Sequence, residues 1–203
     1  TSINGSKRKG IGVGIHGNAD IGEDASEAHV RLFRDGTAML FSCLSEHGTG
    51  QTTNFLKMVA ETLKLPLQRV SLSPPDSVVN PYEFGPAGSR GTYGIASAAI
   101  RATEDALKRL FELAAPILGV TSEDLDTEDG MIFSRKNPDR KISWSAVMGP
   151  DRTITGFGRF EPDYTLTNCM MSFVEVEVDT ETGKVDLIRV VNTSDVGRIV
   201  DPQ

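Results

Sequence analysis

The sequence is poor in cysteine, and it lacks both a long apolar run and an excess of basic residues. Its two cysteines, Cys43 and Cys169, form no CxxC pair, so they provide neither a disulfide framework nor a metal cluster. No stretch approaches the roughly 18 consecutive apolar residues of a membrane-spanning helix. Acidic residues outnumber basic ones by 28 to 21, which gives a net charge of −7. This balance argues against nucleic acid as the main partner.

The amino-terminal segment also lacks the features of a secretory signal. Residues 1–10 are polar and basic rather than apolar, so we expect a cytoplasmic protein. The chain does not begin with methionine, which fits a fragment or a processed product. Its 203 residues suit one large domain or two small ones, and they bury enough surface to fold without disulfides.

The first third of the chain predicts strands. Residues 9–17 alternate glycine with Ile, Val and His, which is typical of a strand. The glycines fit either an edge strand without a ligand or a backbone that a ligand approaches closely. Residues 27–44 predict a hairpin, because Asp35-Gly36 is a strong turn signal between two apolar runs.

Two glycine-containing loops each precede a predicted helix. Residues 45–51, SEHGTGQ, lead into a helix from Thr52 to residue 63, with Thr52 or Thr53 as its cap. A long irregular stretch, residues 74–91, leads into a helix over residues 93–113. The free N–H groups and the dipole of a helix N-terminus favour an anion, although such loops also occur without ligands. In the second loop, the hydroxyls of Ser89 and Thr92 and the guanidinium of Arg90 suit phosphate.

The rest of the chain is mainly β. Trp144, the only tryptophan, is expected in the core, and residues 170–191 predict a hairpin around Thr182-Gly183. We therefore expect an α+β fold, a mixed sheet with two main helices on one face plus an additional β hairpin. Residues 1–120 would hold the first hairpin, both loops and both helices, and residues 121–203 a mainly β continuation that is truncated at its C-terminus.

Four stretches stand out, taken in order: KGIGVG (9–14) with RDGT (34–37), EHGTGQ (46–51) with VAETL (59–63), GSRGT (88–92), and VEVD (176–179) with DVGR (195–198). Together they resemble one family, the molybdopterin-binding large subunit of the xanthine dehydrogenase and aldehyde oxidase group of molybdenum hydroxylases. The resemblance spans nearly the whole chain, and it implies the molybdenum-cofactor-binding fold of that subunit.

The resemblance also implies where a cofactor lies. This cofactor is molybdopterin, or molybdopterin cytosine dinucleotide, carrying molybdenum in the complete enzyme and absent from the isolated chain. The residues implied to face the pterin and the molybdenum are His47, Gly48, Thr49 and Gly50. Those implied at the phosphate or dinucleotide tail are Ala87, Gly88, Ser89, Arg90 and Thr92. Thr49 stands where the family usually has Gln, so contacts there would be fewer or rewired.

No catalytic residue is expected within this chain, and none of its residues is expected to bind metal. The family's catalytic Glu lies in a late Gly-Glu motif that would follow Gln203. The resemblance therefore implies a molybdenum-dependent oxidoreductase, typically a hydroxylase, to which this chain supplies only part of the cofactor site. The implied partners are the remainder of the molybdopterin subunit and the iron–sulfur and FAD modules.

Three interpretations of the chain stay open. It is an excised piece that is inactive alone, a natural small subunit that completes the site beside another polypeptide, or a non-catalytic structural or interaction module that retains the fold without the cofactor. An excised piece would expose surface that is normally covered, so we expect oligomers.

Overall fold

The computed structural model describes residues 5–19, 24–162 and 167–202, and the chain divides into two compact units. We call residues 21–164 the helical unit, and residues 1–20 together with 165–203 the ribbon unit. This division differs from the expected boundary near residue 120. The first strand of the chain pairs with a strand that begins at residue 167, whereas the elements between residues 122 and 160 pack on the long helix before them.

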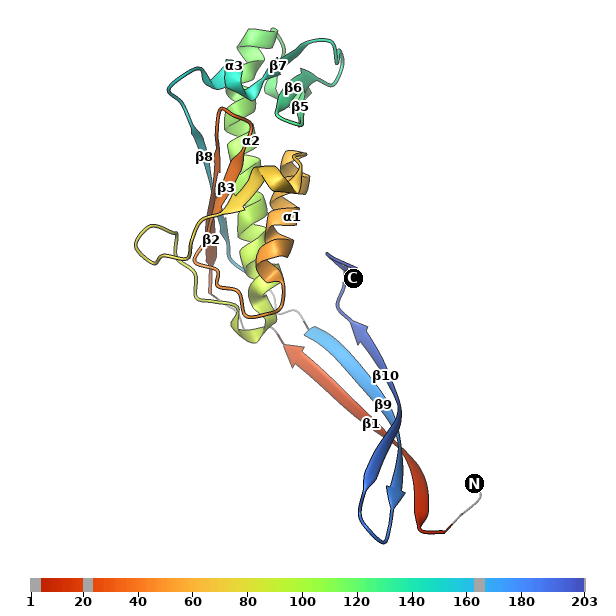
Figure 1. Cartoon of the computed structure of the whole chain (residues 1–203). Coiled ribbons are helices and arrows are strands. Elements are labelled where there is room, and N and C mark those ends of the chain that lie inside the picture. Colours follow the sequence, from red (N-terminus) through yellow and green to blue (C-terminus); the bar gives the residue numbers. More distant parts are fainter. Residues whose placement is uncertain (1–4, 20–23, 163–166, 203) are drawn as a thin grey trace. The chain divides into compact units, whose positions relative to one another are not determined.

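A four-stranded mixed sheet lies at the centre of the helical unit (Figure 1). Strand β2 (Ser26–Leu32) pairs antiparallel with β3 (Ala38–Phe41) and with β8 (Ile154–Phe160), and β4 (Val70–Leu72) runs parallel to β3. Alternate residues of β2 are buried, as a strand with one face on the core requires. The predicted hairpin is confirmed, and Gly36 (φ 83) provides the left-handed conformation of its turn.

Two helices cover one face of this sheet, as expected (Figure 1). They are α1 (Gln51–Leu63) and α2 (Ser97–Leu118), and α2 is preceded by a π-helix, η3 (Gly91–Ala96). Helix α2 ends at Leu118, five residues later than predicted, because Ala114 and Ala115 continue its buried stripe, and Gly119 (φ 64) is its C-cap. The predicted α+β architecture is therefore confirmed.

Helix α2 packs directly on β8 through residues without bulky side chains. A Cβ added at Gly156 would lie 2.1 Å from the carbonyl oxygen of Ala102, and one at Gly158 would lie 2.0 Å from that of Ala98. No side chain fits in that space. The alanines of the helix and the glycines of β8 together allow this close approach.

A small three-stranded sheet lies at the end of α2. It contains β5 (Leu125–Glu128), β6 (Met131–Ser134) and β7 (Lys141–Ser143). The helical unit also contains three short helices outside the second loop: η1 (Leu67–Arg69), η4 (Ser122–Asp124) and α3 (Trp144–Met148). Trp144 is fully buried, and its Nε1–H donates to the hydroxyl of Thr127 at 3.0 Å. The expected core position of the tryptophan is confirmed.

The ribbon unit is a three-stranded antiparallel sheet. Strand β9 (Thr167–Asp179) lies between β1 (Lys7–Ala19) and β10 (Val185–Asp195), and Gly183 (φ 73) turns the predicted hairpin. A Cβ added at Gly10, Gly12 or Gly14 would meet no other atom within 4 Å, which agrees with an edge strand. None of the helices in the described ranges has both the length and the apolar composition of a bilayer span.

Candidate functional site

The first loop, residues 45–51, connects the sheet to α1. Gly48 (φ 89) and Gly50 (φ 72) have left-handed backbone conformations, which a side chain would strain, so the loop turns sharply. Residues 45–50 are exposed, and Nε2 of His47 lies 3.3 Å from the hydroxyl oxygen of Ser45. The residues expected to face the pterin, from His47 to Gly50, therefore lie together on an open part of the surface.

The carboxylate of Glu46 holds this loop against the start of α1. Its Oε1 accepts hydrogen bonds from the backbone N–H groups of Gly48 (2.7 Å) and Gly50 (3.0 Å). Its Oε2 accepts from the backbone N–H (3.1 Å) and the hydroxyl (2.8 Å) of Thr52. These hydrogen bonds, those from Thr52 first, lower the pKa of Glu46 from 4.5 to about 2.

The expected cap at Thr52 or Thr53 is wrong. The residue before α1 is Gly50, which has no side chain to cap with, and the hydroxyl of Thr52 donates to Glu46. Glu46 takes over the cap from outside the helix, because the loop folds back over the helix N-terminus. The negative charge that this end of the helix favours therefore comes from within the chain.

The end of the second loop, residues 85–91, leads into η3 and α2. Gly88 (φ 62) and Ser89 (φ 65) both have left-handed conformations within the short helix η2 (Ala87–Ser89). This conformation is uncommon for a residue with a Cβ such as Ser89. Ala87, Ser89 and Thr92 are exposed, so the loop presents two of its hydroxyls on the surface.

Arg90 points inward, unlike its exposed neighbours. Its guanidinium forms an ion pair with Glu83 (Nη1 to Oε1, 2.5 Å), and both side chains are only 1% exposed. The same group donates to the carbonyl oxygens of Gly85 (3.1 Å) and Asp24 (2.5 Å) and to the hydroxyl of Ser26 (2.9 Å). Burial and these contacts keep the guanidinium from a ligand on the surface, so Arg90 fixes the loop to the start of β2.

The two loops meet at the starts of their helices. A Cβ added at Gly91, the first residue of η3, would lie 3.1 Å from Oε1 of Gln51, the first residue of α1, and 3.6 Å from Cβ of Pro86. The Nε2 group of Gln51 in turn donates to the carbonyl oxygen of Ser45 at 2.7 Å. Gln51 thus links both loops, and Figure 1 shows both helix starts at the same end of the helical unit.

This arrangement fits a ligand with many polar edges. The exposed residues of both loops offer hydroxyls and backbone C=O groups, whereas the N–H groups of Gly48 and Gly50 already donate to Glu46. No group of three or more His, Cys, Asp or Glu side chains within the described ranges is placed to hold a metal ion.

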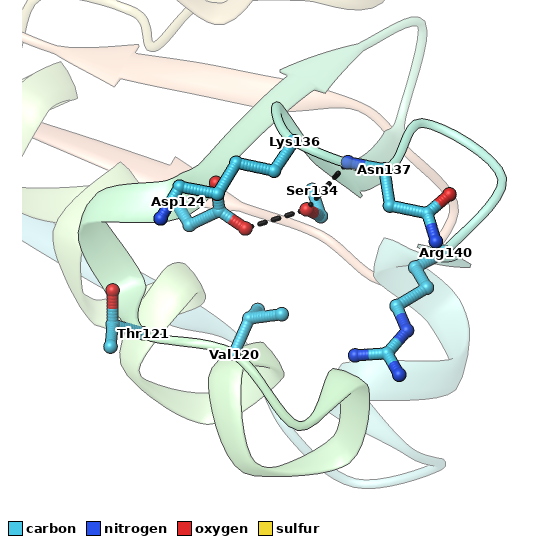
Figure 2. A pocket seen from close by; sticks show the side chains of 7 residues that line it. All are labelled: Val120, Thr121, Asp124, Ser134, Lys136, Asn137 and Arg140. Carbon is cyan, nitrogen blue, oxygen red and sulfur yellow. Dashed lines mark hydrogen bonds between the residues drawn. The ribbon is translucent and has the colours of Figure 1, made fainter.

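A separate pocket of about 330 Å³ lies beyond the other end of α2 (Figure 2). Ser134 donates to the buried carboxylate of Asp124 at 2.5 Å and accepts from the backbone N–H of Asn137 at 3.0 Å. These polar groups satisfy one another and hold the β5–β6 hairpin. The pocket contains none of the predicted site residues.

The sequence did not reveal the roles of two carboxylates. Glu46 was recognised only as part of the resembling motif, although an acid just before a glycine-rich helix start is a usable signal for an internal cap. Glu83 carried no signal at all, since its pairing with Arg90 depends on how residues 74–91 fold.

Comparison with known proteins identifies relatives along the whole chain. Residues 2–203 match the family model of the molybdopterin cofactor-binding domain. The xanthine dehydrogenase molybdenum-binding subunit of Escherichia coli O157:H7 is 27% identical over 98% of this chain and 28% of its own length. An aldehyde oxidoreductase molybdenum-binding subunit of Escherichia coli K12 is 28% identical over 96% of this chain and 26% of its length.

Solved structures agree on the fold. The crystal structure of quinoline 2-oxidoreductase from Pseudomonas putida 86 superimposes with a TM-score of 0.83 at 22% identity, covering 96% of this chain and 28% of that one. The chain spans about a quarter of the length of the curated relatives that it matches. Because the family model covers all but the first residue, this chain belongs to the molybdopterin cofactor-binding domain family.

Proposed function

We propose that this chain supplies the two loops that hold the molybdenum cofactor of an oxidoreductase related to xanthine dehydrogenase and aldehyde oxidase. The observation that carries the proposal is the meeting of the two exposed loops at the starts of α1 and η3, through Gln51 and Gly91. Each loop carries exposed residues and a glycine in a left-handed conformation, and the convergence of the two loops supports a shared ligand site.

In this proposal, the first loop binds the pterin through the exposed residues His47, Gly48, Thr49 and Gly50. The second loop binds the phosphate, or the dinucleotide tail, through Ala87, Gly88, Ser89 and Thr92. Arg90 contributes by holding the second loop in shape rather than by touching the ligand. Thr49 offers one hydroxyl, and backbone carbonyl groups of the loop supply the remaining polar contacts, because the N–H groups of Gly48 and Gly50 donate to Glu46.

The cofactor, when bound, supplies two-electron redox chemistry at its molybdenum, and the chain supplies binding and orientation. We assign no catalytic residue to the chain, which is expected to be inactive when isolated. The remainder of the molybdopterin subunit and iron–sulfur and FAD modules are the proposed partners, because the chain spans only about a quarter of its relatives. The cytosine dinucleotide form and a cytoplasmic location remain predictions.

The test is a charge placed on the second loop. Ser89→Asp sets a carboxylate where the proposal puts a phosphate, and like charges in contact repel by several kcal/mol. In the complete protein, we expect the molybdenum content per polypeptide to fall at least about tenfold. Ser145→Asp, on the short helix α3, is the matched control and should retain the metal. Full molybdenum content in Ser89→Asp would contradict the assignment of this loop.

A further inference from the structure

The start of α1 is already occupied by an anion of the chain itself. The carboxylate of Glu46 meets four hydrogen-bond donors within 2.7–3.1 Å, two on each oxygen, and three of them are backbone N–H groups of Gly48, Gly50 and Thr52. The N-terminus of a helix is where a phosphate commonly binds in proteins, through the same kind of N–H groups. In this chain, these N–H groups already donate to Glu46.

We propose that Glu46 is a positioning residue that stands in for a phosphate at α1, shapes the first loop and reserves it for the uncharged pterin part of the cofactor. This inference rests on the proposed function. Because Glu46 satisfies the donors, an external phosphate could bind at α1 only by displacing it, and the two negative charges would repel each other. The phosphate of the cofactor is thereby directed to the second loop.

The carboxylate in the second loop, that of Glu83, is buried, whereas that of Glu46 is exposed. Glu83 is buried and paired with Arg90, so its charge is neutralised below the loop surface. A phosphate beside the exposed Ser89 would therefore meet no uncompensated charge from Glu83. The two loops therefore differ in the position of their acidic residue. Glu46 is exposed at the start of α1, and Glu83 is buried and paired with Arg90.

The geometry demands a carboxylate at residue 46. All four groups that it meets are donors, and only an ionised carboxylate can accept on both oxygens without offering a hydrogen of its own. Glu46→Gln would turn an NH2 group toward backbone N–H groups on one side. Glu46→Asp shortens the side chain by one methylene, so it should retain part of the contacts, and Glu46→Ala leaves all four donors without the acceptor.

The test is a titration of the full chain with inorganic phosphate, followed by the backbone amide NMR signals of Gly48, Gly50 and Thr52. In the unaltered chain, we expect these three signals not to respond in a saturable way, because Glu46 already fills the site. In Glu46→Ala, we expect saturable shifts of all three, together with a rise in melting temperature on adding phosphate. Glu61→Ala, at an exposed position later on the same helix, is the matched control and should behave like the unaltered chain.

Two results would overturn the inference. One is a saturable phosphate response of these three amides in the unaltered chain, a measurement that needs no variant to fold. The other is a Glu46→Ala or Glu46→Gln chain whose three amide signals stay where they are in the unaltered chain. Neither the amide signals nor the melting temperature depends on molybdenum. The proposed function fails if the complete protein lacks molybdenum, and this result is distinct from either result that overturns the inference.

Discussion

Two charged side chains beside the loops act on the protein itself rather than on a ligand. The sequence predicted Arg90 at a phosphate, since an arginine beside hydroxyls and a helix start suits that group. The structure places its guanidinium at the carboxylate of Glu83 and at the oxygen atoms of three other residues. Sequence spacing places a residue on a loop, but it does not tell which way the side chain points.

Replacing Arg90 tests its internal role. Arg90→Met leaves the buried carboxylate of Glu83 without its cation, and breaking a buried pair in this way costs about 3–5 kcal/mol. We expect this loss in the free energy of unfolding, measured with urea on the chain without cofactor. Arg152→Met, at an exposed position, should change it by less than about 0.5 kcal/mol. If both variants were equally stable, Arg90 would be free to serve a ligand instead.

The low pKa of Glu46 gives the first loop a defined pH dependence. Since hydrogen bonds lower the pKa of the folded state from 4.5 to about 2, Glu46 stabilises the chain above pH 4.5. That contribution should be lost as the pH falls from 4.5 through about 2. The amide signals of Gly48 and Gly50 should follow this protonation, with a midpoint near pH 2. A midpoint near 4.5 would show that the carboxylate does not hold the loop.

At the scale of elements, the sequence was informative where periodicity was strong. The hairpin of β2 and β3, the helix α1 and the hairpin of β9 and β10 lie where alternation and turn residues predicted them. The start of α2 was not predictable in detail, because it is preceded by the π-helix η3, whose first residue, Gly91, packs closely against Gln51 of α1. That contact is a tertiary one, so the sequence of neither helix alone predicts it.

The contact of α2 with β8 gives a test at this scale. A Cβ at Gly158 would lie 2.0 Å from a carbonyl oxygen and 2.4 Å from a backbone nitrogen of α2, and neither group can move independently of the helix. Gly158→Ala should therefore destabilise the chain by about 3 kcal/mol or more in urea unfolding. Gly12→Ala, in a strand where the added Cβ meets no atom within 4 Å, is the control and should cost little. Equal stability of the two variants would contradict the close packing.

At the scale of the whole molecule, the sequence predicted the class of fold but not the division of the chain. Pairing of β1 with β9 joins residues more than 140 positions apart, and no local pattern specifies such a partner. The sheet of the ribbon unit exposes large apolar side chains, among them Ile11 (72%), Ile15 (69%) and Leu187 (69%). Because large exposed apolar surfaces favour association, self-association of the isolated chain stays a prediction.

The central claim is that the two loops hold a molybdenum cofactor together with parts of the protein outside this chain. Its most direct test is the molybdenum and phosphorus content of the protein purified from its own source, with its partners, compared with that of the isolated chain. We expect both elements in the native preparation and neither in the isolated chain, because the chain spans only about a quarter of its relatives. Absence of molybdenum from both preparations would contradict the claim and favour a structural module that kept the fold without the cofactor.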